Sequence, residues 1–308
     1  MLIQSFNQID KNDVSLCGGK ATSLGFMIQN GFVIPDGFVI TTEAFDLYQS
    51  IESEPVTNKI LRQVQADKGE TQGNTINDPN LLSLINQIYQ SFDLLDSEYV
   101  AVRSSATSED SAQFSFAGQF DTFLNVTKGN LVEKVFECFQ GLESPRCIAY
   151  VAQTDLDISK IKIAVVVQAM VQSEVAGVAF TNHPVTKNKN QILIEAGYGL
   201  GEAVVSGLIT PDSYLVDKNN LNLIEVDISA QSKGLFLSKH LEKIEKSNTW
   251  QEIPKTQQNL QKLSNLQIQE LAKICIKIEG LYGFACDIEW ALVGGRFYVV
   301  QSRAVTTN

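Results

Sequence analysis

Four polar side chains interrupt the last two apolar segments of the chain, and their types suit a metal ion and a phosphate. Asp287 and Glu289 stand two positions apart in the first segment, and Gln301 and Arg303 stand two apart in the second. Because side chains alternate between the faces of a strand, the members of each pair share one face. Carboxylate and amide oxygens are ligands for Mg²⁺, and a guanidinium group pairs with phosphate.

The turn at residues 294–295, two glycines, decides whether these two pairs meet. A strict two-residue loop would put the pairs on opposite faces of the hairpin. A three-residue loop, or one bulge, would set Glu289 opposite Gln301. The same shift would set Asp287 opposite Arg303. We expect this offset register if the chain binds ATP; a hairpin held only by salt bridges is the alternative.

A Gly-Gly-Lys sequence near the N-terminus could hold a terminal phosphate. Gly18 and Gly19 would let backbone N–H groups turn toward an anion, and Lys20 begins a helix predicted to run to Gln29. The N-terminal end of a helix carries partial positive charge, which favours an anion there. A tight turn with a solvated lysine is the alternative, because the Walker pattern needs a longer spacing.

Arg103 follows a short apolar strand predicted at 99–102 and opens a loop rich in serine and threonine. Its planar guanidinium group fits phosphate oxygens, and Ser104 and Ser105 could donate to the rest of the ligand. A plain surface loop explains the same residues equally well.

Three other segments could bring backbone close to a ligand. Gly118 would permit close approach and Thr122 could donate a hydrogen bond, although a bulged strand is the alternative. Gln168 and Met170 end an apolar strand whose backbone could pair with adenine, with Met170 on the ring face. Glycines alternate over 197–201, which indicates close approach either to a ligand or to a neighbouring strand.

The composition limits the partners and the cellular setting. The chain has 308 residues, a formal net charge of −11 and a sequence pI near 4.7, so it should repel nucleic acid and anionic membranes. A phosphate site must therefore be a local cluster of basic groups. The five cysteines form no paired motif, and the sequence contains neither a signal-peptide pattern nor a long apolar run. We expect a soluble, cytoplasmic protein.

The order of elements predicts an α+β chain with two lobes and a cleft between them. Helices and strands alternate in the first half, and strands dominate after residue 160. We place the first lobe, with the Lys and Arg phosphate contacts, at approximately 1–190. The second lobe, with the terminal hairpin, covers approximately 191–308. Residues 227–262 are polar and give no functional signal.

Five segments, taken in order, resemble one known family. They are GGKATSLGFMIQNGFVIPDGFVIT, VRSSATSEDSAQFSFAGQFDTFLNV, VVVQAMV, GYGLGEAVVSGLITPDSY, and CDIEWAL with FYVVQSR. Together they resemble the N-terminal AMP/ATP-binding domain of the phosphoenolpyruvate synthase and pyruvate phosphate dikinase family, which rifampin phosphotransferases share. The resemblance covers nearly the whole chain. It implies an ATP-grasp fold with ATP and Mg²⁺ between two lobes.

The resemblance also implies a role for each candidate residue. ATP would be held by phosphate-binding side chains, by backbone and hydroxyl groups around them, by an adenine site, and by ligands of Mg²⁺. In that order the residues are Lys20, Arg103 and Arg303 at phosphate; Gly19, Ser104, Ser105, Gly118 and Thr122 around it; Gln168 and Met170 at adenine; Glu289 and Gln301 at Mg²⁺; and Asp287 as a second catalytic carboxylate.

The implied reaction transfers the β,γ-pyrophosphoryl group of ATP to a histidine on a swivelling domain, with release of AMP. The histidine would then phosphorylate pyruvate or, in the resistance enzymes, rifampin. The family's phosphohistidine segment and its acceptor-substrate domain are not in this sequence, so we expect them on another domain or chain. A nucleotide-binding regulatory module without transfer activity is the alternative, which the full set of candidate residues disfavours.

Overall fold

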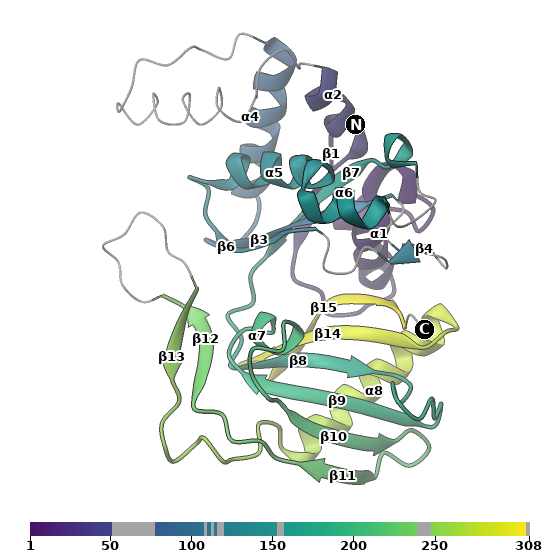
Figure 1. The fold of residues 1–308 in the computed structure, drawn as a ribbon, viewed down its shortest axis with the longest axis vertical. Helices are drawn as coiled ribbons and strands as arrows, with labels where there is room; N and C mark the ends of the chain where they lie inside the picture. The colour runs from purple at the N-terminus through teal and green to yellow at the C-terminus, as the bar shows by residue number, and fades with distance from the viewer. Residues whose placement is uncertain are drawn as a thin grey trace. The chain divides into compact units, whose positions relative to one another are not determined.

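The chain divides into two compact units (Figure 1). Unit 1 contains Met1–Phe26 and Asp36–Met170, and unit 2 contains Met27–Pro35 and Val171–Asn308. The sequence predicts the boundary near residue 190, whereas the units divide after Met170. The computed structural model describes residues 1–50, 78–107, 110–111, 114–115, 120–152, 157–238 and 248–305.

Unit 1 is built on a five-stranded antiparallel sheet with the order β1-β2-β7-β3-β6. A separate two-stranded ribbon, β4-β5, lies outside this sheet. The strands are β1 (Ile3–Ser5), β2 (Gly37–Ile40), β3 (Val100–Ala106), β4 (Asp110–Ser111), β5 (Phe114–Ser115), β6 (Thr122–Val126) and β7 (Ile163–Ala169).

One face of this sheet forms the hydrophobic core of unit 1 with the helices packed on it. Val102 and Val165 of the sheet lie in one buried cluster with Phe45, Leu84 and Phe136 of α2, α4 and α5. The helical elements are η1 (Phe6–Gln8), α1 (Val14–Gln29, whose C-terminal end belongs to unit 2), α2 (Thr42–Ser50), α4 (Pro79–Asp93), α5 (Leu131–Phe139), η2 (Gln140–Glu143), α6 (Pro145–Val151) and η3 (Ile158–Lys160).

Unit 2 is built on a six-stranded antiparallel sheet with the order β11-β10-β9-β8-β14-β15. Helix α8 packs on it, and β12 and β13 form a separate hairpin (Figure 1). The elements are β8 (Val175–Phe180), β9 (Gln191–Tyr198), α7 (Glu202–Val205), β10 (Asp212–Asp217), β11 (Leu223–Asp227), β12 (Lys233–Leu237), β13 (Asn248–Glu252), α8 (Asn265–Tyr282), β14 (Cys286–Val293) and β15 (Arg296–Ala304).

The expected α+β class is confirmed. All five cysteines are buried and free. Within the described part of the chain, no helix is both long and apolar enough to cross a membrane.

The alternating glycines at 197–201 serve backbone packing. Gly199 has a φ of 92°, and a Cβ atom there would come within 2.4 Å of the Leu235 carbonyl oxygen. The next residue, Leu200, donates its backbone N–H to the same oxygen at 2.8 Å. Of the two alternatives open from the sequence, the structure therefore places a neighbouring strand, β12, against this segment.

A buried ion pair gives residues 227–262 a structural role. Lys262 Nζ lies 2.8 Å from Asp212 Oδ1, and both side chains are fully buried. Asp212 also accepts hydrogen bonds from the hydroxyl of Tyr214 at 2.6 Å and from the backbone of Ser229 at 3.0 Å. The pair thus ties the segment before α8 to the start of β10.

We predict that Lys262→Met lowers the unfolding free energy of unit 2 by about 3–5 kcal/mol, because Asp212 would remain buried without its cation. Urea unfolding followed by tryptophan fluorescence measures this, since Trp250 and Trp290, the two tryptophans of the chain, both belong to unit 2.

Lys255→Met is the matched control, because Lys255 is exposed and lies in the same segment. It should change the unfolding free energy by less than about 0.5 kcal/mol. Equal urea midpoints of unfolding for the two variants would show that the ion pair does not stabilise the attachment of this segment.

Candidate functional site

The face of the unit 1 sheet opposite the core carries three of the predicted ligand residues. Arg103 on β3 lies opposite Thr122 on β6 and opposite Val166 on β7. Gln168 lies opposite Ala101, two positions along β3 from Arg103. Cross-strand partners point to the same side of a sheet, so Arg103, Thr122 and Gln168 share one face.

Helix α1 brings the ammonium group of Lys20 to the strand that carries Arg103. The helix is interrupted at Gly18, where φ is 73° and ψ is 168°. Beyond this break, Lys20 Nζ donates to the backbone oxygen of Ser104 at 3.1 Å. The two predicted phosphate-binding cations of unit 1 therefore belong to one local arrangement.

Ser105 holds this arrangement together, because its hydroxyl forms hydrogen bonds with other groups of the protein. Its hydroxyl donates to the Cys17 carbonyl oxygen at 2.9 Å and accepts from the Ala21 backbone N–H at 3.3 Å. A Cβ atom on Gly18 would lie only 2.1 Å from the Ser105 carbonyl oxygen. Ser105 thus bridges the two sides of the break in α1 and fixes the turn that carries Lys20.

Ser104 points away from this face, into the core. The sequence predicts a loop from Arg103 onward, and this is wrong, because β3 continues to Ala106. Alternation along the strand turns the Ser104 side chain toward α5, where its hydroxyl approaches the thiol of Cys138. Burial raises the pKa of that thiol to about 12. In this structure the Ser104 side chain therefore does not join Arg103 on the polar face.

The end of β7 offers fewer backbone donors to an adenine ring than the sequence suggests. The backbone N–H of Ala169 donates to Asp36 at 2.7 Å, and that of Met170 donates to Tyr99 at 2.9 Å. Gln168 is nearly inaccessible, with 1% of its surface exposed. Of the remaining candidates in unit 1, Gly19 lies in α1 just after the break, and Gly118 lies outside the described residues.

In unit 2 the C-terminal hairpin has the offset register that the sequence predicts for a site. Gly294 and Gly295 form the turn with φ values of 57° and 73°. The pairing shifts between Glu289 and Trp290, so that Glu289 lies opposite Gln301. The bulge, rather than a longer turn, brings the polar pairs to the same face.

The same shift places Asp287 opposite Arg303, and their side chains pair. Arg303 Nε and Nη2 both bind Asp287 Oδ2, at 2.9 and 2.7 Å. Asp287 Oδ1 is buried and has no hydrogen-bond partner among the described residues. This ion pair therefore orients the guanidinium group and leaves one carboxylate oxygen available.

Gln301 and Glu289 fit the oxygen ligands that Mg²⁺ prefers. Gln301 is 8% exposed, and its carboxamide forms no hydrogen bond with any residue that the structure describes. The amide atoms are not fully buried, so solvent or a ligand can reach them. No three His, Cys, Asp or Glu side chains within the described ranges are grouped as a metal cage.

No role for Glu195 was predicted from the sequence, but the sheet places this residue on the same face. Glu195 on β9 lies opposite Val178 on β8, and Val178 lies opposite Glu289 on β14. Strict alternation in β9 would have shown which face Glu195 takes, but not which strands lie beside it, because that depends on distant pairing.

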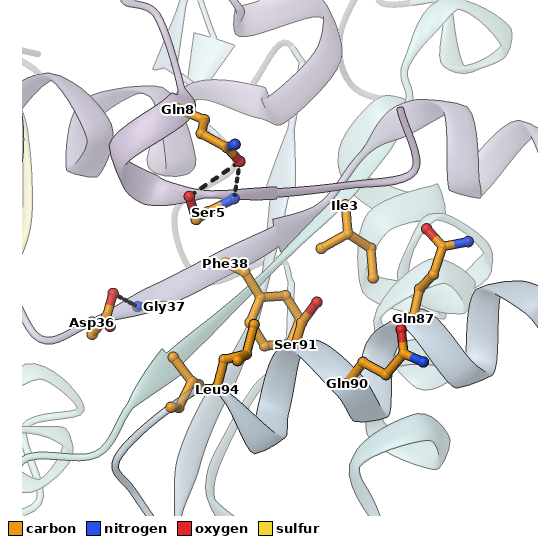
Figure 2. Close-up of a pocket in the computed structure, with 11 residues that line it drawn as sticks. Ile3, Ser5, Gln8, Asp36, Gly37, Phe38, Gln87, Gln90, Ser91 and Leu94 are labelled. Carbon is orange, nitrogen blue, oxygen red and sulfur yellow. Dashed lines mark hydrogen bonds between the residues drawn. The ribbon is translucent and has the colours of Figure 1, made fainter.

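A pocket of about 440 Å³ in unit 1 lies apart from these residues (Figure 2). It is lined by Phe38 and Leu95 and by the amides of Gln8, Gln87 and Gln90. Within it, the Gln8 side chain accepts the backbone N–H of Ser5 at 3.1 Å. None of the residues predicted to bind nucleotide lines this pocket.

The family model described as the AMP/ATP-binding domain of pyruvate phosphate dikinase matches residues 14–308. The chain belongs to this family. The resemblance found in the sequence is thereby confirmed.

Relatives of this chain include phosphoenolpyruvate synthases and a rifampicin phosphotransferase. A "Probable phosphoenolpyruvate synthase" of Methanocaldococcus jannaschii is 38% identical over 98% of this chain and 26% of the relative. A "Phosphoenolpyruvate synthase" of Pyrococcus furiosus is 34% identical over 99% of this chain and 44% of the relative. A "Rifampicin phosphotransferase" of Bacillus subtilis is 34% identical over 99% of this chain and 36% of the relative. The chain thus spans less than half the length of these relatives.

Among solved structures, a D-alanine–D-alanine ligase from Bacillus anthracis aligns with a TM-score of 0.36 and 9% identity. The alignment covers 94% of this chain and 56% of that chain.

The two neighbouring serines of β3 provide a matched test of their different surroundings. We predict that Ser105→Ala destabilises the protein by about 1–3 kcal/mol, because the Ala21 N–H and the Cys17 carbonyl lose their bridge. Ser104→Ala should cost less than about 1 kcal/mol, since a thiol is a weak partner. Urea unfolding followed by circular dichroism measures both.

ATP affinity, measured in parallel, separates positioning from direct contact. Ser105→Ala should weaken ATP binding together with stability, and Ser104→Ala should leave both nearly unchanged. Weaker ATP binding by Ser104→Ala at unchanged stability would instead make Ser104 a ligand residue.

Proposed function

We propose that this chain binds MgATP and transfers the β,γ-pyrophosphoryl group to a histidine on another domain or chain, as part of a pyruvate, water dikinase. The observation that carries the proposal is the hairpin register of unit 2, which aligns Glu289 with Gln301 and Asp287 with Arg303. Membership in the dikinase AMP/ATP-binding family supports the nucleotide. The phosphoenolpyruvate synthases among the relatives support the overall reaction.

Unit 1 would supply cations to the transferring phosphates. Lys20 and Arg103 sit on a turn and a strand that Ser105 holds together. Phosphoryl transfer needs little covalent work from the protein and much positioning and charge neutralisation. Thr122, opposite Arg103, would donate to the same phosphates.

Unit 2 would supply the oxygen ligands for Mg²⁺ and a third cation. Glu289 and Gln301 would hold the metal, which would neutralise charge on the phosphate oxygens. Arg303, oriented by Asp287, would bind phosphate. Asp287 would act as the second carboxylate of the site, through the oxygen that Arg303 does not engage.

In the proposed step, a neutral histidine nitrogen attacks the β-phosphorus of ATP. The new N–P bond replaces the bond from the β-phosphorus to the oxygen that bridges it to the α-phosphorus. AMP leaves with that oxygen, and the histidine carries the pyrophosphoryl group. Converging cations would stabilise the charge that moves onto the leaving AMP.

A rifampin phosphotransferase is the second candidate function, supported by the Bacillus subtilis relative. Both candidates use the same first step, and the domain that binds the acceptor distinguishes them. Assay of the whole protein with pyruvate and with rifampin would decide between them.

We predict that calorimetric titration of the chain with ATP shows saturable binding that strengthens with Mg²⁺. Glu289→Gln should remove most of this Mg²⁺ dependence, because a charged ligand of the metal is lost. Glu270→Gln is the matched control, since Glu270 is exposed on α8. No binding of millimolar ATP by the native chain, with or without Mg²⁺, would contradict the proposal.

We further predict that Arg103→Ala slows transfer to a supplied histidine domain by at least about 100-fold, comparable to the loss of one donor at an oxyanion site. Transfer is measured as AMP released in a single turnover. Arg146→Ala, at an exposed ion pair with Asp121, should have no effect. Full transfer by Arg103→Ala would remove Arg103 from the site.

A further inference from the structure

A continuous row of cross-strand partners connects Glu195 with the predicted metal ligands. Glu195 lies opposite Val178, Val178 lies opposite Glu289, and Glu289 lies opposite Gln301. All four side chains therefore point to one face of the sheet. Two strand spacings of ~4.8 Å separate the Cα atoms of Glu195 and Glu289 by about 10 Å, with only the small Val178 between them.

Glu195 carries a charge that the described protein does not balance. It is half-buried and forms no hydrogen bond or ion pair with any described residue. Burial raises its pKa, and the nearby negative charge of Asp287 raises it further. A carboxylate withdrawn from water beside another carboxylate is unfavourable unless a cation approaches it.

The neighbouring side chains on this face offer Glu195 no cation. Its cross-strand partners are Val178 and Ser213. The next row on the same face contains Asp287 and Arg303, and Arg303 already binds Asp287 through two nitrogens. Within the unit 2 sheet, these neighbours therefore supply no positive charge to Glu195.

Gln301 and Asp287 leave oxygen atoms on this face that a ligand could bind. Gln301 is more than nine-tenths buried, lies directly opposite Glu289, and has no hydrogen-bond partner within the described chain. Asp287 Oδ1 is likewise buried without a partner. Amide and carboxylate oxygens are the ligand types that a hard cation such as Mg²⁺ prefers.

We propose that Glu195 is an outer carboxylate of the metal site, which strengthens binding of a divalent cation at Glu289 and Gln301 by its charge. This inference rests on the proposed function and adds a residue to its site. At the separation given by the sheet, Glu195 acts across space or through a metal-bound water. Mg²⁺ retains several waters in protein sites, which leaves room for such a contact.

The test uses Mn²⁺ as the probe, because free Mn²⁺ is counted directly by electron paramagnetic resonance. Glu195→Gln keeps the side-chain shape and removes the charge. It should weaken Mn²⁺ binding by about 3- to 10-fold, as expected for one charge acting on a divalent ion through a partly aqueous medium. Glu195→Asp, which retains the charge, should keep most of the affinity, and Glu270→Gln should match the native chain.

The affinity for metal-free ATP, measured in EDTA, should change in the opposite direction on the same substitution. An unpaired carboxylate repels the phosphates, so Glu195→Gln should bind metal-free ATP more tightly than the native chain. Both effects should shrink as salt is raised, because the Debye length falls. A residue that only supports the fold would weaken both ligands together.

The outcomes separate this inference from the proposed function. If the native chain binds Mn²⁺ and ATP and the Glu195→Gln variant binds both with the same affinities, the inference is overturned and the proposed function still stands. Weaker binding of both ligands by Glu195→Gln would also overturn it, in favour of a structural role. Failure of the native chain to bind either ligand would overturn the proposed function, and the inference with it.

Discussion

The pairing register of the C-terminal hairpin determines which groups unit 2 can present together. Without the bulge after Glu289, the two-residue turn would place the amide and guanidinium groups on one face and the carboxylates on the other. The opposite face is apolar, with Ile288 and Trp290 buried there. Burying unpaired polar groups among such side chains costs about 2–7 kcal/mol each. Val300, the extra residue of the bulge, therefore makes a polar face and an apolar core compatible in one hairpin.

The same alternation separates structure from chemistry in unit 1. Along β3, Ser104 joins the core, while Arg103 and Ser105 take the opposite face. The Ser105 hydroxyl forms its hydrogen bonds with α1. The close contact between Ser105 and α1 requires that Gly18 lack a side chain. The position of Lys20 thus depends on two small residues that do not need to touch a ligand. Small residues beside two cationic side chains can serve to let two backbone segments approach each other, as well as to let a phosphate approach.

The fold was predictable where local pattern and tertiary context agree, and not elsewhere. Runs of β-branched residues predicted β7 and β8, and the candidate hairpin needed only a correct choice of register. The extension of β3 through its serines was missed, because strand preference depends on neighbouring strands more than on residue type. The segment 27–35 joins unit 2 through a hydrogen bond of 2.9 Å from Val299 to Val33, a distant partner that no local pattern reveals.

The distribution of charge explains how so acidic a chain could hold an anionic ligand. Charges farther than roughly 8 Å are largely screened at physiological salt, so the net charge of −11 matters less than the groups beside the ligand. In the proposed function, those groups in unit 1 are the cations Lys20 and Arg103. In unit 2, Glu289 and Glu195 share one face of the sheet with the pair of Asp287 and Arg303. A metal–nucleotide complex carries charges of both signs, so the proposed function offers each set of candidate residues a group of opposite charge.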